Sequence, residues 1–223
     1  MTVLFWIPVS ISFFFFLFEK FLFYQYRGFE SSQGLTGCEI ARHILDDYGF
    51  SGVVVEPLAR CCRWQKTKLD QFFLDEFICT GKSLYSLAWA AREAVRRVKG
   101  SGFILFLDLR RFGGEGLRYV ILAAWIVCVA GFLSANLRVL IPVSLVVFDI
   151  VIFGAFLAWP RESEISRQGY DLSRRSAYFE VDEQARLKVL MNSMRFHDFS
   201  FIWRVPVDLF REFRKSEKKS RGL

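Results

Sequence analysis

Three long apolar runs constrain what this chain can fold into. Residues 2–18 (TVLFWIPVSISFFFFLF) and residues 119–135 contain no charged side chain, and residues 139–159 contain one, Asp149. A helix that spans a bilayer needs about 20 mainly apolar residues, with a lower limit near 17. The runs therefore predict three transmembrane helices, and the last two form a hairpin because only a short polar segment separates them.

The composition and the N-terminal run agree with a membrane protein. Hydrophobic residues make up 53% of the 223 residues and include 26 phenylalanines, which is more apolar surface than a soluble core of this size requires. The first run has no basic residues before it and no small-residue cleavage site after it. These features predict an uncleaved anchor at residues 1–18 rather than a signal peptide.

The basic residues predict the orientation of the chain. Arg110, Arg111 and Arg118 precede the second apolar run, and Arg161 and Arg167 follow the third. Lysine and arginine concentrate on the cytoplasmic side of membrane proteins. We therefore expect the main domain and the C-terminus of this multi-pass chain to lie in the cytoplasm, with the N-terminus outside.

The net charge of +7 does not indicate a nucleic-acid partner, because the chain has no recognised nucleic-acid-binding motif. The basic tail instead predicts binding to anionic lipid headgroups, and its basic residues are Arg211, Arg214, Lys215, Lys218, Lys219 and Arg221. Residues 199–213 mix aromatic and basic side chains around Pro206. This segment is either an interfacial amphipathic helix or a solvated tail, and both alternatives stay open.

The part between the first two runs, residues 19–118, predicts a small α+β cytoplasmic domain in a mostly α membrane protein. A short amphipathic helix should end near Gly49, and a strand in GVVVEP should end at Pro57. Residues 68–81 (KLDQFFLDEFICTG) are either a strand or a loop. A longer helix at residues 82–99 has a clear apolar stripe, formed by Leu84, Leu87, Ala88, Ala91, Val95 and Val98. After the hairpin (119–159), residues 160–223 form a charged, helical cytoplasmic region.

Cysteine and histidine are few. The five cysteines are an odd number, and the adjacent Cys61 and Cys62 do not suit an ordinary structural disulfide, so we expect a reducing compartment with Cys79 an inert buried thiol. The chain has two histidines, His43 and His197, which excludes a histidine-rich metal site within one chain.

The helix at residues 82–99 contains AAREAVRR, in which Arg92 and Arg96 lie on one helix face and Glu93 follows the first. With histidine at both arginine positions this would be His-Glu-x-x-His, the zinc-peptidase motif. The alternative is an ordinary charged face, in which Glu93 pairs with Arg97 for about 0.2–0.5 kcal/mol.

Four segments together resemble the bacterial YugP-type neutral zinc metallopeptidases. They are SSQGLTGCEIARHILDDYGF, VVVEP, SLYSLAWAAREAVRR and, after the hairpin, WPRESEISRQ. The likeness covers about Ser31 to Arg167, and Gly34-Leu35-Thr36-Gly37 is among its most specific pieces. The resemblance implies a zincin-like helix, a catalytic zinc and a third zinc ligand on the segment after the hairpin. It also implies that the membrane is the bacterial cytoplasmic (inner) membrane.

Carried over by position, Glu93 stands where the family has its catalytic base and Glu162 where it has its glutamate ligand, followed in register by Ser166 and Arg167. Both histidine ligands are replaced, by Arg92 and Arg96. The Asp-His-Tyr-Asp run of the family has no counterpart in LARCCRWQKTKLDQF, and its final apolar helix is replaced by a charged segment.

Arginine is always protonated and has no lone pair to give a metal. We therefore expect no zinc and no other cofactor, and Glu93 as an inactive equivalent of the base. In place of the metal, Arg92 and Arg96 should pair with Glu162 as a structural clasp. The sequence predicts a pseudoenzyme that binds, scaffolds or regulates an unknown protein partner at the membrane.

Two alternatives of other classes remain. The first is a membrane hydrolase or peptidase with a mechanism foreign to the family, for which Cys79 would be the candidate nucleophile. The second is a lipid-headgroup-binding membrane protein unrelated to proteolysis, in which the membrane-embedded Asp149 and the basic tail carry the function.

Overall fold

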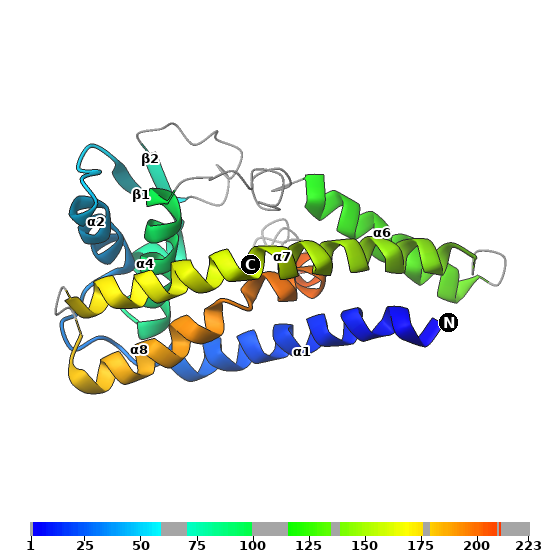
Figure 1. Cartoon of the computed structure of the whole chain (residues 1–223), viewed down its shortest axis with the longest axis horizontal. Helices are drawn as coiled ribbons and strands as arrows, with labels where there is room; N and C mark the ends of the chain where they lie inside the picture. Colours follow the sequence, from blue (N-terminus) through cyan, green and yellow to red (C-terminus); the bar gives the residue numbers. More distant parts are fainter. Residues whose placement is uncertain are drawn as a thin grey trace, which may run out of the picture. The chain divides into compact units, whose positions relative to one another are not determined.

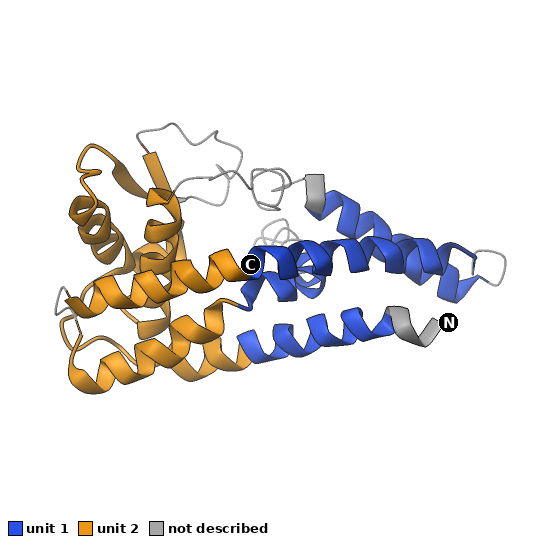
Figure 2. Cartoon of the chain, in the orientation of Figure 1, with its two compact units in different colours: residues 1–19, 103–159, 196–223 blue, residues 20–102, 160–195 orange. Residues whose placement is uncertain are grey.

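The computed structural model describes residues 2–58, 71–99, 116–134, 139–175, 179–208 and 210. These residues are mostly helical and include one two-stranded sheet, β1-β2 (Figure 1). The chain divides into two compact units, which Figure 2 colours separately. Unit 1 comprises Met1–Glu19, Phe103–Trp159 and Phe196–Leu223, and unit 2 comprises Lys20–Gly102 and Pro160–Arg195.

Unit 1 contains the apolar runs, which form helices. They are α1 (Thr2–Tyr26), α6 (Gly116–Leu133) and the first part of α7 (Ile141–Arg175). A short 3-10 helix, η3 (His197–Ser200), and a helical segment at 201–208 complete the unit. Their inward faces share one core, whose buried residues are Val9, Ile121, Ala124, Leu145, Phe148, Val151, Ile202 and Val205.

The remaining face of these helices is apolar as well. Phe14, Ile126, Ile150 and Phe153 are each more than 60% exposed. By length and composition, two helices qualify as membrane spans, at Trp6–Tyr26 and within Ile141–Arg175, and Arg118–Leu133 is a shorter apolar helix. The helices of the first and third predicted spans thus qualify by length and composition, and the described part of the second is a shorter apolar helix.

Two helices extend further than the apolar runs. α1 continues past Phe18 through Glu19 to Tyr26, and α7 continues past Trp159 through Pro160 to Arg175. Proline lacks a backbone N–H, so Pro160 removes one hydrogen bond of α7 without ending the helix. Hydropathy located the apolar parts of these helices but not their ends, because the polar residues that follow each apolar run are helical too.

Unit 2 is built around two packed helices, α2 (Gly37–Asp47) and α4 (Leu84–Val98). The predicted amphipathic helix is confirmed as α2, because Ile40, Ile44 and Leu45 are fully buried and Gly49 follows with a positive φ of 79°. The predicted helix at residues 82–99 is confirmed as α4. The last part of α7 and α8 (Val181–Met194) also belong to this unit.

The sheet corrects one prediction and resolves another. β1 (Val54–Leu58) does not end at Pro57, which lies inside the strand opposite Leu74. An edge strand tolerates proline where its nitrogen does not face the partner strand. The ambiguous segment 68–81 contains β2 (Gln71–Asp75), parallel to β1, followed by the short helix α3 (Glu76–Thr80).

The GLTG segment starts α2. Gly34 has a positive φ of 65°, and Thr36 is the N-cap in a capping box with Glu39. A Cβ atom on Gly37 would overlap the carbonyl oxygen of Ile78, so glycine allows α2 to approach α3. This piece of the sequence therefore has a structural explanation at each of these positions.

The expectation of free thiols is wrong for one pair, because Cys38 on α2 and Cys79 on α3 form a disulfide with a Cα–Cα distance of 4.5 Å. The two residues are 41 positions apart, so no local spacing pattern marks them as partners. Cys128 is free and buried in α6. Cys61 and Cys62 lie outside the described residues.

Part of the C-terminal segment is packed inside unit 1. Phe199, Ile202 and Val205 are each less than 10% exposed, and the helical segment passes through Pro206 to residue 208. Residues 199–205 are therefore not a solvated tail, and their position at a membrane interface stays a prediction. The basic tail from Arg211 onward lies outside the described residues.

Candidate functional site

The site lies on α4, which presents Arg92, Glu93 and Arg96 to the last part of α7. Ser83 caps α4 by accepting a hydrogen bond from the backbone N–H of Ser86 at 3.3 Å. The alanine-rich face of α4 is buried, and Arg92 belongs to that face with no exposed surface. Arg92 is thus a core residue, which rules out the interpretation of a solvated charged face.

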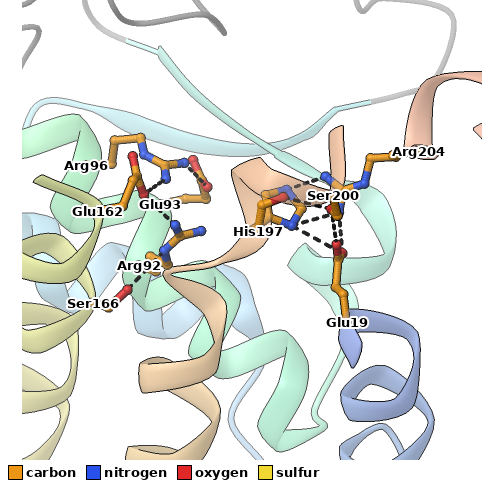
Figure 3. Close-up of polar contacts among 9 residues, drawn as sticks. All are labelled: Glu19, Arg92, Glu93, Arg96, Glu162, Ser166, His197, Ser200 and Arg204. Carbon is orange, nitrogen blue, oxygen red and sulfur yellow. Dashed lines mark hydrogen bonds and ion pairs between the residues drawn. The ribbon is translucent and has the colours of Figure 1, made fainter. Parts of the chain in front are cut away.

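The two arginines converge on one carboxylate of α7. Arg92 and Arg96 each donate from Nη2 to the same oxygen of Glu162, Oε2 (Figure 3). The Nε of Arg92 also donates to the hydroxyl oxygen of Ser166, one turn further along α7, at 3.2 Å. The structure therefore brings together the positions that the resemblance assigned to the metal ligands.

Glu93 belongs to the same cluster. The Nη1 of Arg96 donates to Glu93 Oε1, so Arg96 bridges the equivalent of the base and the equivalent of the ligand. The side chains of Arg96, Glu93 and Glu162 are 14%, 21% and 10% exposed, respectively. We call these four residues, Arg92, Glu93, Arg96 and Glu162, the clasp.

The rim of the clasp is solvated and also charged. Glu164 is bonded by Arg167 at 3.0 Å and lies 3.6 Å from the ammonium of Lys99. The hydrogen bond from Arg167 is the main cause that lowers the pKa of Glu164.

Arg92 also contacts an aromatic ring. The guanidinium carbon of Arg92 lies 5.6 Å from the ring centre of Trp89, which is a cation–π contact.

The residues present do not fit a zinc ion. A catalytic zinc takes about three nitrogen, sulfur or carboxylate ligands and a water. Two of the three family positions hold guanidinium groups, which cannot donate a lone pair and which repel a cation. Among the described residues, no group of three or more His, Cys, Asp and Glu side chains could hold a metal. The clasp residues therefore do not form a site that could hold zinc and its bound water.

The charges of the clasp explain why it can be buried. Two neutral imidazoles and a zinc dication carry a total charge of +2, and so do two guanidinium groups. The two glutamates therefore meet the same compensating charge in either arrangement. Because buried ions are tolerated only when they are paired and hydrogen-bonded, the arginines fill this position without leaving a net charge.

The structure also contains a second charged cluster, in unit 1, which sequence reasoning missed. Arg204 donates to Glu19 and to His197, and His197 Nδ1 lies 3.2 Å from Glu19 Oε1 (Figure 3). Ser200 donates to Glu19 Oε2 at 2.6 Å. Glu19 directly follows the first apolar run, but no sequence pattern links it to a histidine 178 positions later.

This second cluster is not a catalytic triad. In a triad the serine hydroxyl donates to the histidine ring, and the carboxylate binds the other ring nitrogen. Here the Ser200 hydroxyl bonds Glu19 and the backbone oxygen of His197, and Ser200 is fully buried. Cys79, the other candidate nucleophile, is bonded to Cys38. In this structure neither Ser200 nor Cys79 is a nucleophile that donates to a histidine ring.

Asp149 lies on the apolar part of α7 and is not part of either cluster. Its Oδ1 atom is buried and has no hydrogen-bond partner among the described residues. It is partly buried beside the core residues Leu145 and Phe148 of the same helix.

The comparisons with known proteins identify the family. No curated protein and no solved structure matches the chain. Residues 1–194 match the sequence profile of the family described as "Putative neutral zinc metallopeptidase". That match covers most of the chain and includes α4 and the whole of α7, so this protein belongs to the neutral zinc metallopeptidase family.

Proposed function

We propose that this protein is a membrane-anchored member of the family that does not hydrolyse peptides and serves as a binding, scaffolding or regulatory protein. The observation that carries the proposal is the pairing of Glu162 with Arg92 and Arg96, which stand where the family has its histidine ligands. The catalytic position is thus occupied by a charge-balanced structural contact.

The chemistry of Glu93 supports the same conclusion. In a zinc peptidase the metal lowers the pKa of its bound water from about 15.7 to about 7, and the glutamate accepts the proton of that water. Glu93 accepts a hydrogen bond from Arg96, and the arginines at the two histidine positions cannot hold a metal that would acidify a water. Its carboxylate contributes to the clasp rather than to proton transfer.

The clasp has a defined mechanical role in this proposal. It connects α4 with the part of α7 that follows the apolar segment, and α4 is also packed against α2 and α8. A partner protein that binds unit 2 would meet a fixed arrangement of these helices. We further propose that α1, α6 and α7 cross the bilayer, with unit 2 in the cytoplasm, as the basic residues beside the apolar runs predict.

The basic tail extends this proposal to lipids. Its lysines and arginines would bind anionic headgroups at about 1 kcal/mol per basic residue near the surface. Binding of the full chain to anionic liposomes should fall with salt and with removal of residues 211–223, and equal binding by both forms would exclude the tail as the lipid site.

Zinc content and proteolysis together test the main proposal. The full chain, purified in detergent, should contain no stoichiometric zinc and should not degrade casein, with or without a chelator. The double variant Arg92→His/Arg96→His is the matched positive control, because it restores both nitrogen ligands beside Glu162. It should bind one zinc per chain, and adding Glu162→Gln should weaken that binding.

Stoichiometric zinc and chelator-sensitive proteolysis by the unaltered protein would overturn the proposal. Absence of zinc from the histidine variant, in protein that retains its helical circular dichroism, would show that the arginines are not at ligand positions.

A further inference from the structure

An open cavity of about 420 Å³ lies on unit 2 beside α2 and β1. Cys38, Glu39, Arg42 and His43 line it from α2, and residues 53–55 line it from the other side. Arg42 is fixed there, because its Nη2 donates to Asp46 at 2.6 Å and to the backbone oxygen of Phe50 at 2.7 Å. The cavity therefore has an ordered, polar wall with one sulfur atom in it.

The two halves of the disulfide differ in access. Cys38 is partly exposed and lines the cavity, whereas Cys79 is only 5% exposed. Cys38 is also the second residue of α2, and the first turn of a helix favours the thiolate form of cysteine. One cysteine can be reached by a small molecule, and the other is hidden directly behind it.

We propose that Cys38 and Cys79 form a reversible redox site, in which Cys38 exchanges with a low-molecular-weight disulfide and Cys79 resolves the product. Persistent disulfides are rare in the cytoplasm, and those that occur there are usually transient or redox-sensing. With the cytoplasmic orientation of unit 2 proposed above, the bond is a switch rather than a permanent crosslink.

The exchange balances without any metal or further cofactor. The Cys38 thiolate attacks one sulfur of the small disulfide, forms a mixed disulfide and releases one thiolate. The Cys79 thiolate then attacks Cys38 Sγ, which forms the Cys38–Cys79 bond and releases the second thiolate. Two cysteine thiols are oxidised, one small disulfide is reduced to two thiols, and the two protons pass from the cysteines to the released thiolates.

The bond joins elements that lead into the clasp. It fixes the first turn of α2 to α3, where the Gly37 backbone N–H also donates to the Gly81 carbonyl oxygen at 3.0 Å. Gly81 lies between α3 and α4, the helix of Arg92 and Arg96. Oxidation therefore tightens the contact between α2 and the start of α4. Reduction removes the covalent link that joins residue 38 to residue 79.

The test uses the full chain in detergent with Cys61, Cys62 and Cys128 replaced by serine, so that only the proposed pair remains. The protein is equilibrated with mixtures of reduced and oxidised glutathione, quenched with acid, and alkylated with a maleimide that adds mass to each free thiol. We expect a transition from two alkylated thiols to none. Reduction should lower the melting temperature by on the order of 5–10 °C.

Two further variants separate the roles of the cysteines. Cys79→Ser should accumulate one glutathione on Cys38, because the resolving thiol is absent, whereas Cys38→Ser should take up glutathione at least tenfold more slowly. In both variants the melting temperature should no longer respond to reduction.

Three results would overturn the proposal. The two thiols could remain free at every glutathione ratio, or the bond could remain closed even in pure reduced glutathione, which would make it a permanent crosslink. Equal glutathione uptake by Cys38→Ser and Cys79→Ser would contradict the assigned order of attack.

Discussion

At the scale of residues, the clasp depends on one oxygen atom. Glu162 Oε2 accepts from both Arg92 and Arg96, and the surrounding side chains exclude most water. In such a position the paired charges contribute little net stability, but losing one of them is costly, because a buried charge is then left uncompensated. The contact therefore requires that both the basic and the acidic charge are present.

A charge exchange tests this dependence. Glu162→Arg should destabilise the protein by about 3–5 kcal/mol, because it buries a third guanidinium beside two others. Adding Arg92→Glu should recover much of that loss by restoring one buried pair. Thermal unfolding in detergent measures both effects.

Glu164→Arg is the matched control for this exchange. Glu164 lies on the same helix, but its side chain is 38% exposed, so the loss of its surface pairs with Arg167 and Lys99 should cost at most about 1 kcal/mol each, well below the loss for Glu162→Arg. No recovery in the double variant, or an equal loss in the control, would refute the clasp as a stabilising contact.

At the scale of elements, the start of α2 is determined by a few side chains. The Glu39 carboxylate accepts from the backbone N–H and the hydroxyl of Thr36, at 2.7 and 2.9 Å, and Thr36 Oγ1 accepts from the Glu39 N–H at 3.4 Å. The backbone hydrogen bond to Thr36 is the main cause that lowers the pKa of Glu39. The capping box therefore requires an ionised Glu39.

Removal of the cap should have a pH-dependent effect. Thr36→Ala should cost about 1 kcal/mol of stability at neutral pH. Because the pKa of Glu39 is lower in the folded state, the contribution of its carboxylate is complete above the unfolded value of about 4.3 and disappears as the pH falls through the folded value. The penalty should therefore shrink in acid.

Ser193→Ala controls for the loss of a helical hydroxyl. The partly exposed Ser193 hydroxyl of α8 donates to the Val189 carbonyl oxygen at 2.8 Å, and we expect a change within about 0.5 kcal/mol. A pH-independent loss for Thr36→Ala in thermal unfolding would show that the Thr36 hydroxyl does not bind the Glu39 carboxylate.

The elements also show what sequence reasoning can and cannot reach. Periodicity was sufficient for α2 and α4, because each has one buried face. It failed at β1, where local propensity ended the strand at Pro57 but pairing with β2 continued it to Leu58. The Glu19 cluster and the Cys38–Cys79 bond were missed because each joins residues far apart in sequence, and only the tertiary fold brings them together.

The candidate site could be predicted from the sequence only in part. The spacing of Arg92 and Arg96 placed both on one helix face, but pairing with Glu162, 66 positions after Arg96, was expected from the family register. Ser166 as a partner of Arg92 and the stacking of Arg92 on Trp89 had no such signal, since both depend on the exact packing of α7 and α4.

At the scale of the whole molecule, the exposed apolar face of unit 1 is a surface that water solvates poorly. Phe153 is 63% exposed in the middle of the apolar part of α7, and Ile150, one turn earlier, is 65% exposed. Large contiguous apolar surfaces on soluble proteins mark sites of contact with proteins or membranes. The proposed bilayer would cover the apolar parts of these helices.

A lysine substitution on this face tests whether the face contacts lipid or water. Phe153→Lys should cost about 2.5–3.5 kcal/mol of insertion if the position faces lipid, and should cost little if it faces water. The measurement is the share of the chain that stays with membranes after alkaline carbonate extraction. Val181→Lys is the control, because Val181 is 81% exposed on α8, outside the candidate spans. Equal extraction of both variants would contradict a lipid-facing α7.

The shared oxygen of Glu162 has a consequence for how this protein can evolve. Reverting only Arg92 to histidine would leave Arg96 on Glu162 and Glu93, and reverting only Arg96 would leave the buried Arg92 on the same carboxylate. Neither single step regains a metal ligand set, and each removes a buried pair. Under the proposed function, a return to zinc-dependent peptidase activity would therefore pass through a less stable protein without a complete set of metal ligands.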